Sequence, residues 1–252
     1  MYKIPAKTLF MGQKLIYVPE CHSTNSLLND LNDQQELPEG TVLITDHQSA
    51  GRGQRGNTWE SMPGMNLTFS ILLRPGFLEP KDQFRLNMMV SIAIVDCLGS
   101  IIPYGIKLKW PNDILVTGKK MGGILIESQL QRGSHSCSVV GLGINVNQRH
   151  FSYPDAASMN AITDVVYDLD ELFQRLLESM EGEYLNLRTG GIKTLKQRYL
   201  NYLFRFKEPH HFQSNGENFE GTINDVDENG KLCMVSEGKT RSFSFKEVKF
   251  LN

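Results

Sequence analysis

The stretch "QSAGRGQRGNTWES" at residues 48–61 contains three glycines with the spacing G-x-G-x-x-G and two arginines. In a dinucleotide-binding fold, such glycines follow a strand and open a helix whose N-terminus receives the pyrophosphate. The run "TVLITDHQ" (41–48) predicts the strand, but no helix can follow, because Pro63 comes too soon and "NLTFSILL" (66–73) predicts a second strand. The stretch therefore predicts a cationic loop between two strands. It disfavours a nicotinamide or flavin enzyme and suits a ligand with phosphate charge and a planar ring.

The composition is ordinary for a soluble globular protein. Of the 252 residues, 40% are hydrophobic and 21% are charged, and the net charge of −2 argues against a dedicated nucleic-acid binder. The cysteines lie far apart and form no C-x-x-C pair, which indicates neither a zinc ribbon nor a disulfide framework. They are Cys21, Cys97, Cys137 and Cys233. Because no segment resembles a signal peptide or a membrane span, we expect a cytoplasmic protein.

The larger, N-terminal part of the chain predicts a mixed β-sheet with flanking helices, in the α+β class rather than among alternating βαβ folds. Besides the two strands above, strands are predicted in "KLIYVPE", "IKLKW", "DILVTGKKMGGILIES" and "SCSVVGLGINVN". Helices are predicted at residues 23–32, 80–102, 168–187 and 190–201, and we expect residues 148–165 to be irregular.

The character of the chain changes at about residue 204. The segment "FEGTINDVDENGKLCMVSEGKTRSFSFKEVKFL" predicts short strands joined by "DENG" and "SEGK" turns, as in a small barrel or sandwich. We therefore expect two domains, a main domain at residues 1–203 and a small β domain at residues 204–252.

Four polar clusters stand where predicted strands and helices end. The first, "STN" (23–25), could cap a helix or contact a ligand. The second is the glycine-arginine loop with Trp59 at its exit, although a solvated surface loop with Trp59 in the core is the alternative. Residues 49–58 have no large apolar side chain, so we expect nothing to anchor them and a bound ligand to order them.

The other two clusters lie in the middle of the chain. In "KWPND", Pro111 ends the strand and points Asn112 and Asp113 off the sheet, unless the segment is a turn with an Asx hydrogen bond. In "GKKMGGILIES" and "GLGINVN" (141–147), glycines interrupt strands, and either β-bulges or the close approach of a ligand accounts for them. Lys120, just before the first of these glycines, could reach a phosphate or a carboxylate.

In this order and spacing, "GRGQRGNTW", "KWPND", "KKMGGILIE" and "GLGINVN" resemble the motifs of the biotin–protein ligase family. The match runs from about Ser23 to Asn147, and the C-terminal part resembles the family's small SH3-like β-barrel domain more loosely. The resemblance implies a catalytic core similar to that of class II aminoacyl-tRNA synthetases. It also implies two steps: the biotin carboxylate attacks the α-phosphate of ATP, giving biotinyl-5′-AMP and pyrophosphate, and a lysine of a biotin carboxyl carrier domain then attacks the acyl adenylate.

The resemblance further implies roles for the matched residues. The catalytic residues that it implies are Lys120, Arg52 and Arg55. The biotin contacts that it implies are Ser23, Thr24, Asn25, Gln48, Gly51, Arg52, Gly53, Gln54, Lys120, Gly123 and Gly141. The nucleotide contacts that it implies are Arg52, Gln54, Arg55, Asn57, Trp59, Asn112, Lys120 and Asn145, with Trp59 as a lid over the adenine.

Elementary chemistry supports these roles. The first step joins two anions, so a cation such as Lys120 between the carboxylate and the α-phosphate would stabilise the transition state. Mg²⁺ should share the charge of the triphosphate, with Asp113 as a direct or water-mediated ligand. Because an acyl adenylate hydrolyses readily, the loop has to close and exclude water. ATP and Mg²⁺ are thus the expected co-substrate and activator, biotin is the substrate, and no tightly bound prosthetic group is expected.

Two departures from the family pattern affect these expectations. Many members have Arg where this chain has Gln54 and Asn57, so retention of the intermediate could be weaker unless neighbours such as Arg55 compensate. Some bacterial members begin with a DNA-binding winged helix, whereas the first predicted strand here starts near Lys14. We therefore expect a monofunctional ligase whose partners are biotin, ATP and the carrier domain of a biotin-dependent carboxylase, without DNA or a membrane. Whether it forms a homodimer stays open.

The sequence disfavours three other functions. A lipoate–protein ligase or octanoyltransferase shares the fold, but the "GRGQRGNTW" loop disfavours it. A biotin-responsive regulator without catalysis is disfavoured by Lys120 and the intact loop. A nicotinamide oxidoreductase is disfavoured by the strand that follows the glycines.

Overall fold

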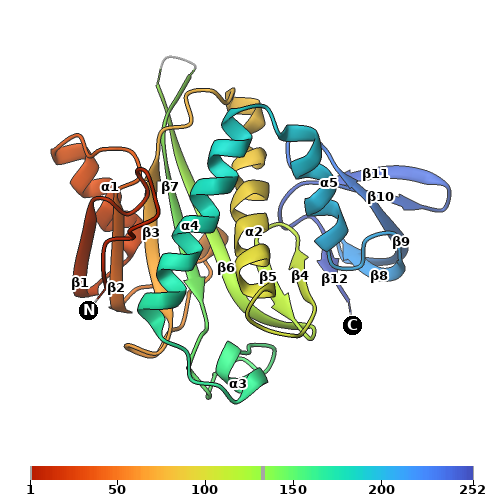
Figure 1. The fold of residues 1–252 in the computed structure, drawn as a ribbon. Helices are drawn as coiled ribbons and strands as arrows, with labels where there is room; N and C mark the ends of the chain where they lie inside the picture. Colours follow the sequence, from red (N-terminus) through yellow and green to blue (C-terminus); the bar gives the residue numbers. More distant parts are fainter. Residues whose placement is uncertain (1, 132–133, 252) are drawn as a thin grey trace.

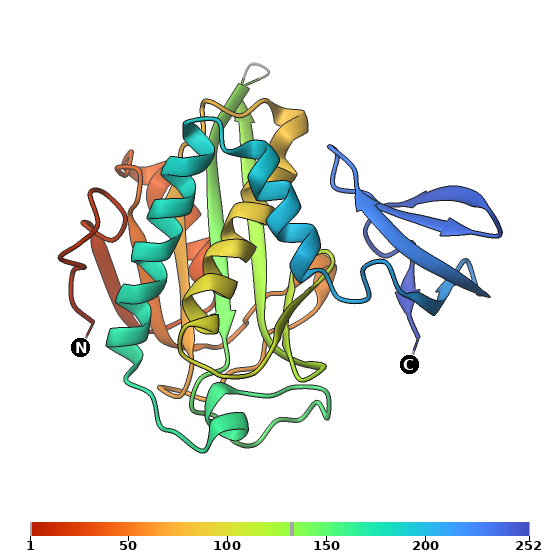
Figure 2. The same cartoon turned by 45° about the vertical axis from the view of Figure 1, so that its right-hand side comes forward.

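The computed structural model describes residues 2–131 and 134–251, which form two sheets that follow one another along the chain (Figures 1 and 2). The first sheet is mixed and seven-stranded, with the order β1-β2-β3-β7-β6-β5-β4. Its strands are β1 (Leu15–Cys21), β2 (Val42–Gln48), β3 (Leu67–Leu73), β4 (Ile106–Lys109), β5 (Asp113–Val116), β6 (Lys119–Gln131) and β7 (Ser134–Ile144). Strands β1 and β2 are parallel, and every other neighbouring pair is antiparallel. The expected α+β class is therefore confirmed.

Helices cover both faces of this sheet. They are α1 (Thr24–Gln34), α2 (Gln83–Gly99), α3 (Met159–Thr163), α4 (Leu169–Arg188) and α5 (Ile192–Tyr202). Every side chain of β3 is buried, and alternate residues point to opposite faces. Phe69 packs edge-on against Phe173 of α4 at a centroid distance of 5.2 Å, whereas Leu72 belongs to the cluster around Leu28 of α1. Helices α2 and α4 thus cover one face, and α1 covers part of the other, leaving room beyond its N-terminus.

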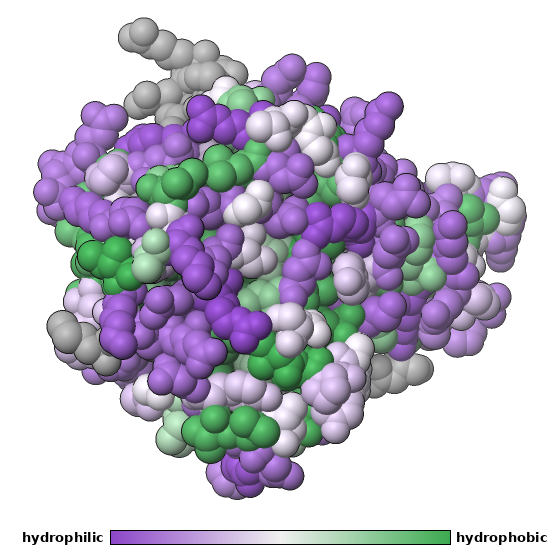
Figure 3. Space-filling model, viewed as in Figure 1, coloured by the Kyte–Doolittle hydropathy of each residue, from purple (hydrophilic) through white to green (hydrophobic). Residues whose placement is uncertain are grey.

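Helix α4 has the amphipathic pattern of a surface helix. The side chain of Asp168 caps it by accepting a hydrogen bond from the backbone N–H of Glu171 at 3.0 Å. Its apolar residues are buried against α2, while hydrophilic residues dominate the outer surface on this side of the molecule (Figure 3). No helix within the described residues is long and apolar enough to cross a membrane.

Three details differ from the sequence predictions. The helix expected at residues 80–102 begins with a 3₁₀ turn at Pro80–Asp82, and α2 ends at Gly99. The segment expected to be irregular contains the short helix α3. The long run that was expected to be one strand is two strands, β5 and β6. Thr117 and Gly118 separate them with positive φ angles of 48° and 80°, which is the geometry of a tight hairpin turn.

The second sheet is antiparallel and five-stranded, with the order β11-β10-β9-β8-β12. Its strands are β8 (Pro209–Ser214), β9 (Glu217–Val226), β10 (Leu232–Ser236), β11 (Lys239–Phe243) and β12 (Lys249–Phe250). It is joined to the first sheet near β4: the indole N–H of Trp110 donates to the carbonyl of Gly230 at 2.9 Å, and the ring of Phe245 lies 5.2 Å from that of Trp110. This junction brings the C-terminal segment to the edge of a cavity in the first sheet.

Candidate active site

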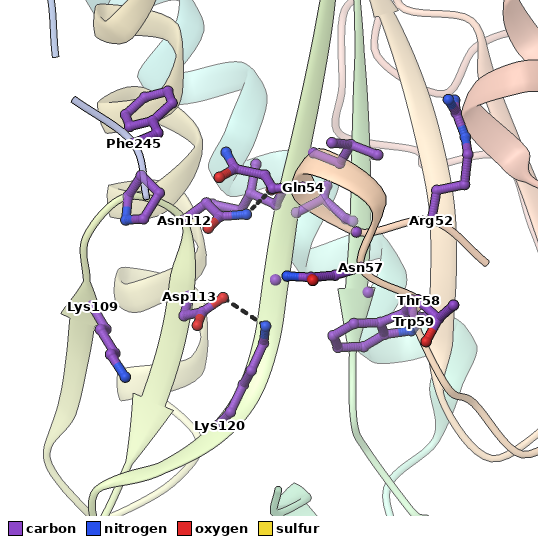
Figure 4. Close-up of a pocket in the computed structure, with 18 of the residues that line it drawn as sticks. Arg52, Gln54, Asn57, Thr58, Trp59, Lys109, Asn112, Asp113, Lys120 and Phe245 are labelled. Carbon is purple, nitrogen blue, oxygen red and sulfur yellow. Dashed lines mark hydrogen bonds and ion pairs between the residues drawn. The ribbon is translucent and has the colours of Figure 1, made fainter. Parts of the chain in front are cut away.

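A cavity of about 450 Å³ opens on the α1 face of the large sheet, a size typical of small-molecule sites (Figure 4). It extends from the N-terminus of α1, across β7 and β6, to β5 and the C-terminal segment. The residues that line it are Ser23, Thr24, Asn25, Gln48, Arg52, Gly53, Gln54, Asn57, Thr58, Trp59, Thr68, Lys109, Trp110, Pro111, Asn112, Asp113, Lys120, Gly123, Ile124, Leu125, Gly141, Leu142, Gly143, Phe245, Lys246, Val248, Lys249 and Phe250.

The end of the cavity beside α1 is a network of buried polar groups. Gln48 Oε1 accepts from the backbone N–H of Thr24 at 2.8 Å and lies 3.2 Å from the Thr24 hydroxyl. The hydroxyl of Ser70 lies 2.7 Å from the hydroxyl of Thr24 and 2.6 Å from Asn25 Oδ1. Ser23 is the N-cap residue of α1, but its side chain makes no capping hydrogen bond. Its hydroxyl instead accepts a long hydrogen bond from Arg52 Nε at 3.5 Å, and Ser23 lines the cavity beside the helix N-terminus.

Glycines on β7 let two side chains lie against the sheet. A Cβ atom on Gly141 would lie 2.2 Å from Asn25 Oδ1, and one on Gly143 would lie 2.4 Å from Cε2 of the Trp59 ring. Close approach therefore accounts for these two glycines, but it is made by side chains of the protein itself. The β-bulge expectation holds on the neighbouring strand, where the register of β5 and β6 shifts after the pair Ile114 and Gly122.

The glycine-arginine loop folds over the cavity as a tight β-like turn. The N–H of Trp59 donates to the carbonyl of Gly51 at 2.9 Å, and that of Gly53 to the carbonyl of Asn57 at 2.7 Å. A guanidinium nitrogen of Arg52 lies 2.6 Å from a carboxylate oxygen of Glu127 on β6. The expectation that nothing anchors the loop is therefore wrong: polar and ionic contacts hold it where apolar ones are lacking. A 3₁₀ turn of three residues, rather than a nucleotide-binding helix, occupies the end of the glycine motif.

Lys120 lies near the middle of the cavity and points at Asp113 on the neighbouring strand (Figure 4). Their Nζ and Oδ1 atoms are 2.7 Å apart, and Nζ is 5.8 Å from the centroid of the Trp59 ring. Asn112 donates from Nδ2 to the carbonyl of Ile124 at 2.6 Å, so it is bonded across to β6. The strand break at Pro111 thus places Asn112 and Asp113 at the wall of the cavity.

The ring of Trp59 is half-buried on the glycines of the sheet, and its indole N–H is buried without a hydrogen-bond partner among the described residues. An unpaired buried donor costs about 1–3 kcal/mol. The unpaired donor therefore makes this position of the ring less stable.

The C-terminal segment closes the far end of the cavity. Phe245, Val248 and Phe250 contribute apolar surface there, and Lys246 and Lys249 contribute positive charge. Lys109 of β4 adds a third lysine, whose Nζ is 5.3 Å from the centroid of the Phe250 ring. This end combines cations and rings, whereas the end beside α1 offers uncharged hydrogen-bonding groups with Arg52 at the rim.

Comparisons with known proteins agree with this geometry. Residues 17–145 match the model of the Biotin/lipoate A/B protein ligase family. Over 244 residues the chain is 31% identical to the Bifunctional ligase/repressor BirA of Bacillus subtilis, an alignment that covers 94% of this chain and 74% of that protein. The chain belongs to the biotin protein ligase family. It is also 28% identical over 217 residues to the biotin–[acetyl-CoA-carboxylase] ligase of Mycobacterium tuberculosis, covering 84% of this chain and 80% of that one.

Solved structures of this ligase family have the same fold. The biotin protein ligase from Aquifex aeolicus in complex with biotin and ATP superposes with a TM-score of 0.78 at 25% sequence identity. The superposition covers 95% of this chain and 100% of that one. The fold expected from the resemblance, a ligase core followed by a small β domain, is therefore confirmed.

Most residues that the resemblance singled out lie together in the cavity of this ligase. Two residues whose side chains the structure describes do not line it. Gly51 is buried beneath the loop and is not among the lining residues. Asn145 is buried just beyond β7, where Nδ2 donates to the carbonyl of Ala157 at 3.1 Å and Oδ1 has no partner among the described residues. The side chain of Arg55 lies outside the described part of the structure, so its catalytic and nucleotide-binding roles remain predictions.

Sequence reasoning missed the lysines and rings of the C-terminal segment, together with Lys109 and Glu127. The run "FSFKEVKFLN" (243–252) alternates rings and lysines, and this pattern was the available signal. The described residues contain no cluster of three or more metal-ligating side chains. Asp113, paired with Lys120, is the one carboxylate among the described lining residues.

Proposed function

We propose that this chain activates biotin with ATP to form biotinyl-5′-AMP and then transfers the biotinyl group to a lysine of a biotin carboxyl carrier domain. One observation carries the proposal. A single cavity joins a polar end, uncharged except for Arg52 at its rim, to a cationic, ring-lined end, and Lys120 stands between the two. A cation at that point is what the union of a carboxylate with a phosphate requires. Residues 1–203 would form the catalytic domain, and residues 204–252 would close its nucleotide end.

The polar end suits the fused ring of biotin, which presents two N–H donors and a carbonyl acceptor. Gln48 Oε1 and the hydroxyls of Ser23 and Thr24 offer acceptors and donors at fixed places, because Thr24 is bonded to Gln48 and Ser70. A site whose groups are already bonded to one another loses little conformational entropy when it binds a ligand. Apart from Arg52 at the rim, the groups of this end are uncharged and fit a ureido group better than a phosphate.

The other end suits the nucleotide. Trp59 can stack on a base. Its buried indole N–H has no hydrogen-bond partner among the described residues, which would favour a shift of the ring onto the base. Lys109, Lys246 and Lys249 would attract the phosphates that leave as pyrophosphate. Gln54 and Asn57, which stand where many family members have Arg, also line the cavity but bring no charge.

Between the two ends, Lys120 would neutralise the approaching carboxylate and α-phosphate. Its bond to Asp113 holds the ammonium group in place before substrates bind, which lowers the cost of reorganisation in the first step. Mg²⁺, when bound with ATP, would withdraw charge from the triphosphate. The residues fit such an ion only in part, because Asp113 would supply one carboxylate and the phosphates and water the remaining ligands.

In the second step the same groups would stabilise the leaving group instead of the attacking carboxylate. The carrier lysine attacks the acyl carbon, the bond between this carbon and the phosphate oxygen breaks, and AMP leaves as an anion that Lys120 can stabilise. The loop around Arg52 would keep water from the adenylate until the lysine arrives.

Biotin-dependent release of pyrophosphate from ATP tests the proposal and separates it from the lipoate alternative. The purified chain with ATP and Mg²⁺ should release pyrophosphate when biotin is added and not when lipoate or octanoate is added. Release with lipoate and not with biotin would move the chain to the other branch of the family. Biotin binding without pyrophosphate release would indicate a regulator without catalysis.

A further inference from the structure

Glu127 stands behind the loop that covers the polar end of the cavity, and it takes part in neither step of the proposed reaction. On β6 it faces the same side as Gly123 and Leu125, four and two residues before it, but it lies outside the cavity lining. One carboxylate oxygen, Oε2, accepts two hydrogen bonds, from Arg52 at 2.6 Å and from Asn25 Nδ2 at 2.9 Å. Glu127 therefore links the loop to the N-terminus of α1.

The Asn25 side of this link is rigid. Asn25 is only 2% exposed, and its Nδ2 also donates to the carbonyl of Leu125 at 3.1 Å. Its Oδ1 accepts from Ser70 at 2.6 Å, and the missing side chain of Gly141 leaves the space in which it lies. With both ends of the amide bonded, Asn25 fixes one position for the carboxylate of Glu127.

The Arg52 side of the link can exchange. The side chains of Arg52 and Glu127 are 43% and 34% exposed, so water and salt reach the pair. Arg52 points away from Lys120 and Asp113 (Figure 4), and its Nε lies 3.5 Å from the hydroxyl of Ser23 at the cavity wall. The side chain thus runs from the loop, past Ser23, to β6, and crosses the rim of the polar end.

We propose that Glu127 is a positioning residue that holds Arg52 across the rim of the polar end and so slows the escape of biotin and of biotinyl-5′-AMP. This inference rests on the proposed function, since it assumes that biotin occupies the polar end. Glu127 touches neither substrate nor the reacting atoms. It acts through Arg52, and its charge rather than its shape matters, because the pair is ionic.

The test measures dissociation rates in the full-length protein by stopped-flow, with biotin and separately with biotinyl-5′-AMP as the probe. Glu127→Gln keeps the shape and an acceptor for Asn25 but removes the charge, and it should speed dissociation roughly two- to fivefold, as expected for a partly exposed ion pair. Glu127→Ala, which also removes the bond to Asn25, should speed it further. Glu20→Gln is the matched control, because it removes a carboxylate charge that faces His47 rather than the loop.

Ionic strength supplies a readout that a merely structural role would not move. At about 1 M salt, where the screening length is about 3 Å, the wild-type rate should rise to that of Glu127→Gln, while the variant should hardly respond. Two results would show that Glu127 does not position Arg52. Either Glu127→Gln releases both ligands at the wild-type rate, or the difference in dissociation rate between the wild-type protein and the variant persists at high salt. If the wild-type protein binds no biotin at all, the proposed function fails instead, so the two failures are distinguishable.

Discussion

Lys120 Nζ and Asp113 Oδ1 lie 2.7 Å apart on the neighbouring strands β6 and β5, between the polar and the cationic ends of one cavity. The lysine side chain is 40% exposed and that of the aspartate 24%, so the pair is open to substrates from the cavity. Its partner carboxylate and the nearby Trp59 ring hold the ammonium group where the two substrates would meet. The expected function depends on this placement.

Replacing Lys120 with Ala should therefore impair adenylate formation. The loss of a charge-assisted contact to the carboxylate and phosphate should cost about 2–4 kcal/mol in the first step, measured as biotin-dependent pyrophosphate release. Lys119→Ala is the control, because Lys119 is exposed and does not line the cavity. Adenylate formation at a near-normal rate in Lys120→Ala would remove this residue from the mechanism.

Two glycines on one strand should separate the two halves of the site. Gly141 and Gly143 face the same side of β7, but a methyl group at the first would displace Asn25 and at the second would displace Trp59. Gly141→Ala should therefore raise the KM for biotin. Gly143→Ala should raise the KM for ATP, by an amount equivalent to about 1–3 kcal/mol of lost base stacking.

Gly105→Ala is the matched control for both variants, since a Cβ atom there would meet nothing within 4 Å. Trp59→Ala should reproduce the effect of Gly143→Ala without a large fall in melting temperature. Equal effects of Gly141→Ala and Gly143→Ala on both KM values would mean that the cavity is not divided between biotin and nucleotide.

The sequence allowed the core and much of the site to be predicted, for a physical reason. Apolar runs with strand or helix period report local burial, so β3 and α2 could be found from them, and Pro111 could be identified as a strand break. Local signals do not report contacts between distant segments. The pair of Arg52 and Glu127 joins residues 75 positions apart, and its existence depends on how the loop lies over β6.

The same limit applies to the C-terminal segment and to the glycines. The hydrogen bond from Trp110 to Gly230 spans 120 positions and brings Lys249 to the nucleotide end, which no local pattern specifies. Gly141 and Gly143 could be recognised as unusual for strands, but only the packing of Asn25 and Trp59 shows what approaches them.

Lys249 provides a test of the role of the C-terminal segment. If it attracts the phosphates of ATP, Lys249→Ala should raise the KM for ATP several-fold. The KM for biotin should not change, because Lys249 lines the end of the cavity opposite the polar end. Lys239→Ala, which changes an exposed lysine outside the cavity lining, is the control. A rise in both KM values, or in neither, would exclude a specific contact between Lys249 and the nucleotide.

Limited digestion with trypsin tests closure of the loop. Trypsin cuts after accessible arginines, and in the free protein an exposed ion pair and a few backbone hydrogen bonds hold the loop at Arg52. Slow cleavage after Arg52 is expected in the free protein, and biotin with ATP and Mg²⁺ should suppress it, whereas NADH should not. Identical cleavage with and without biotin and ATP would remove the step that excludes water.

The most direct test of the whole account is transfer to a carrier. The purified chain should be incubated with ATP, Mg²⁺, biotin and a biotin carboxyl carrier domain, and the carrier then examined by intact and peptide mass spectrometry. The account predicts one biotinyl group on one lysine of the carrier, formed only when ATP is present and lost in Lys120→Ala. A carrier that stays unmodified while it accepts biotin from another biotin protein ligase would contradict the assignment of this cavity to biotin transfer.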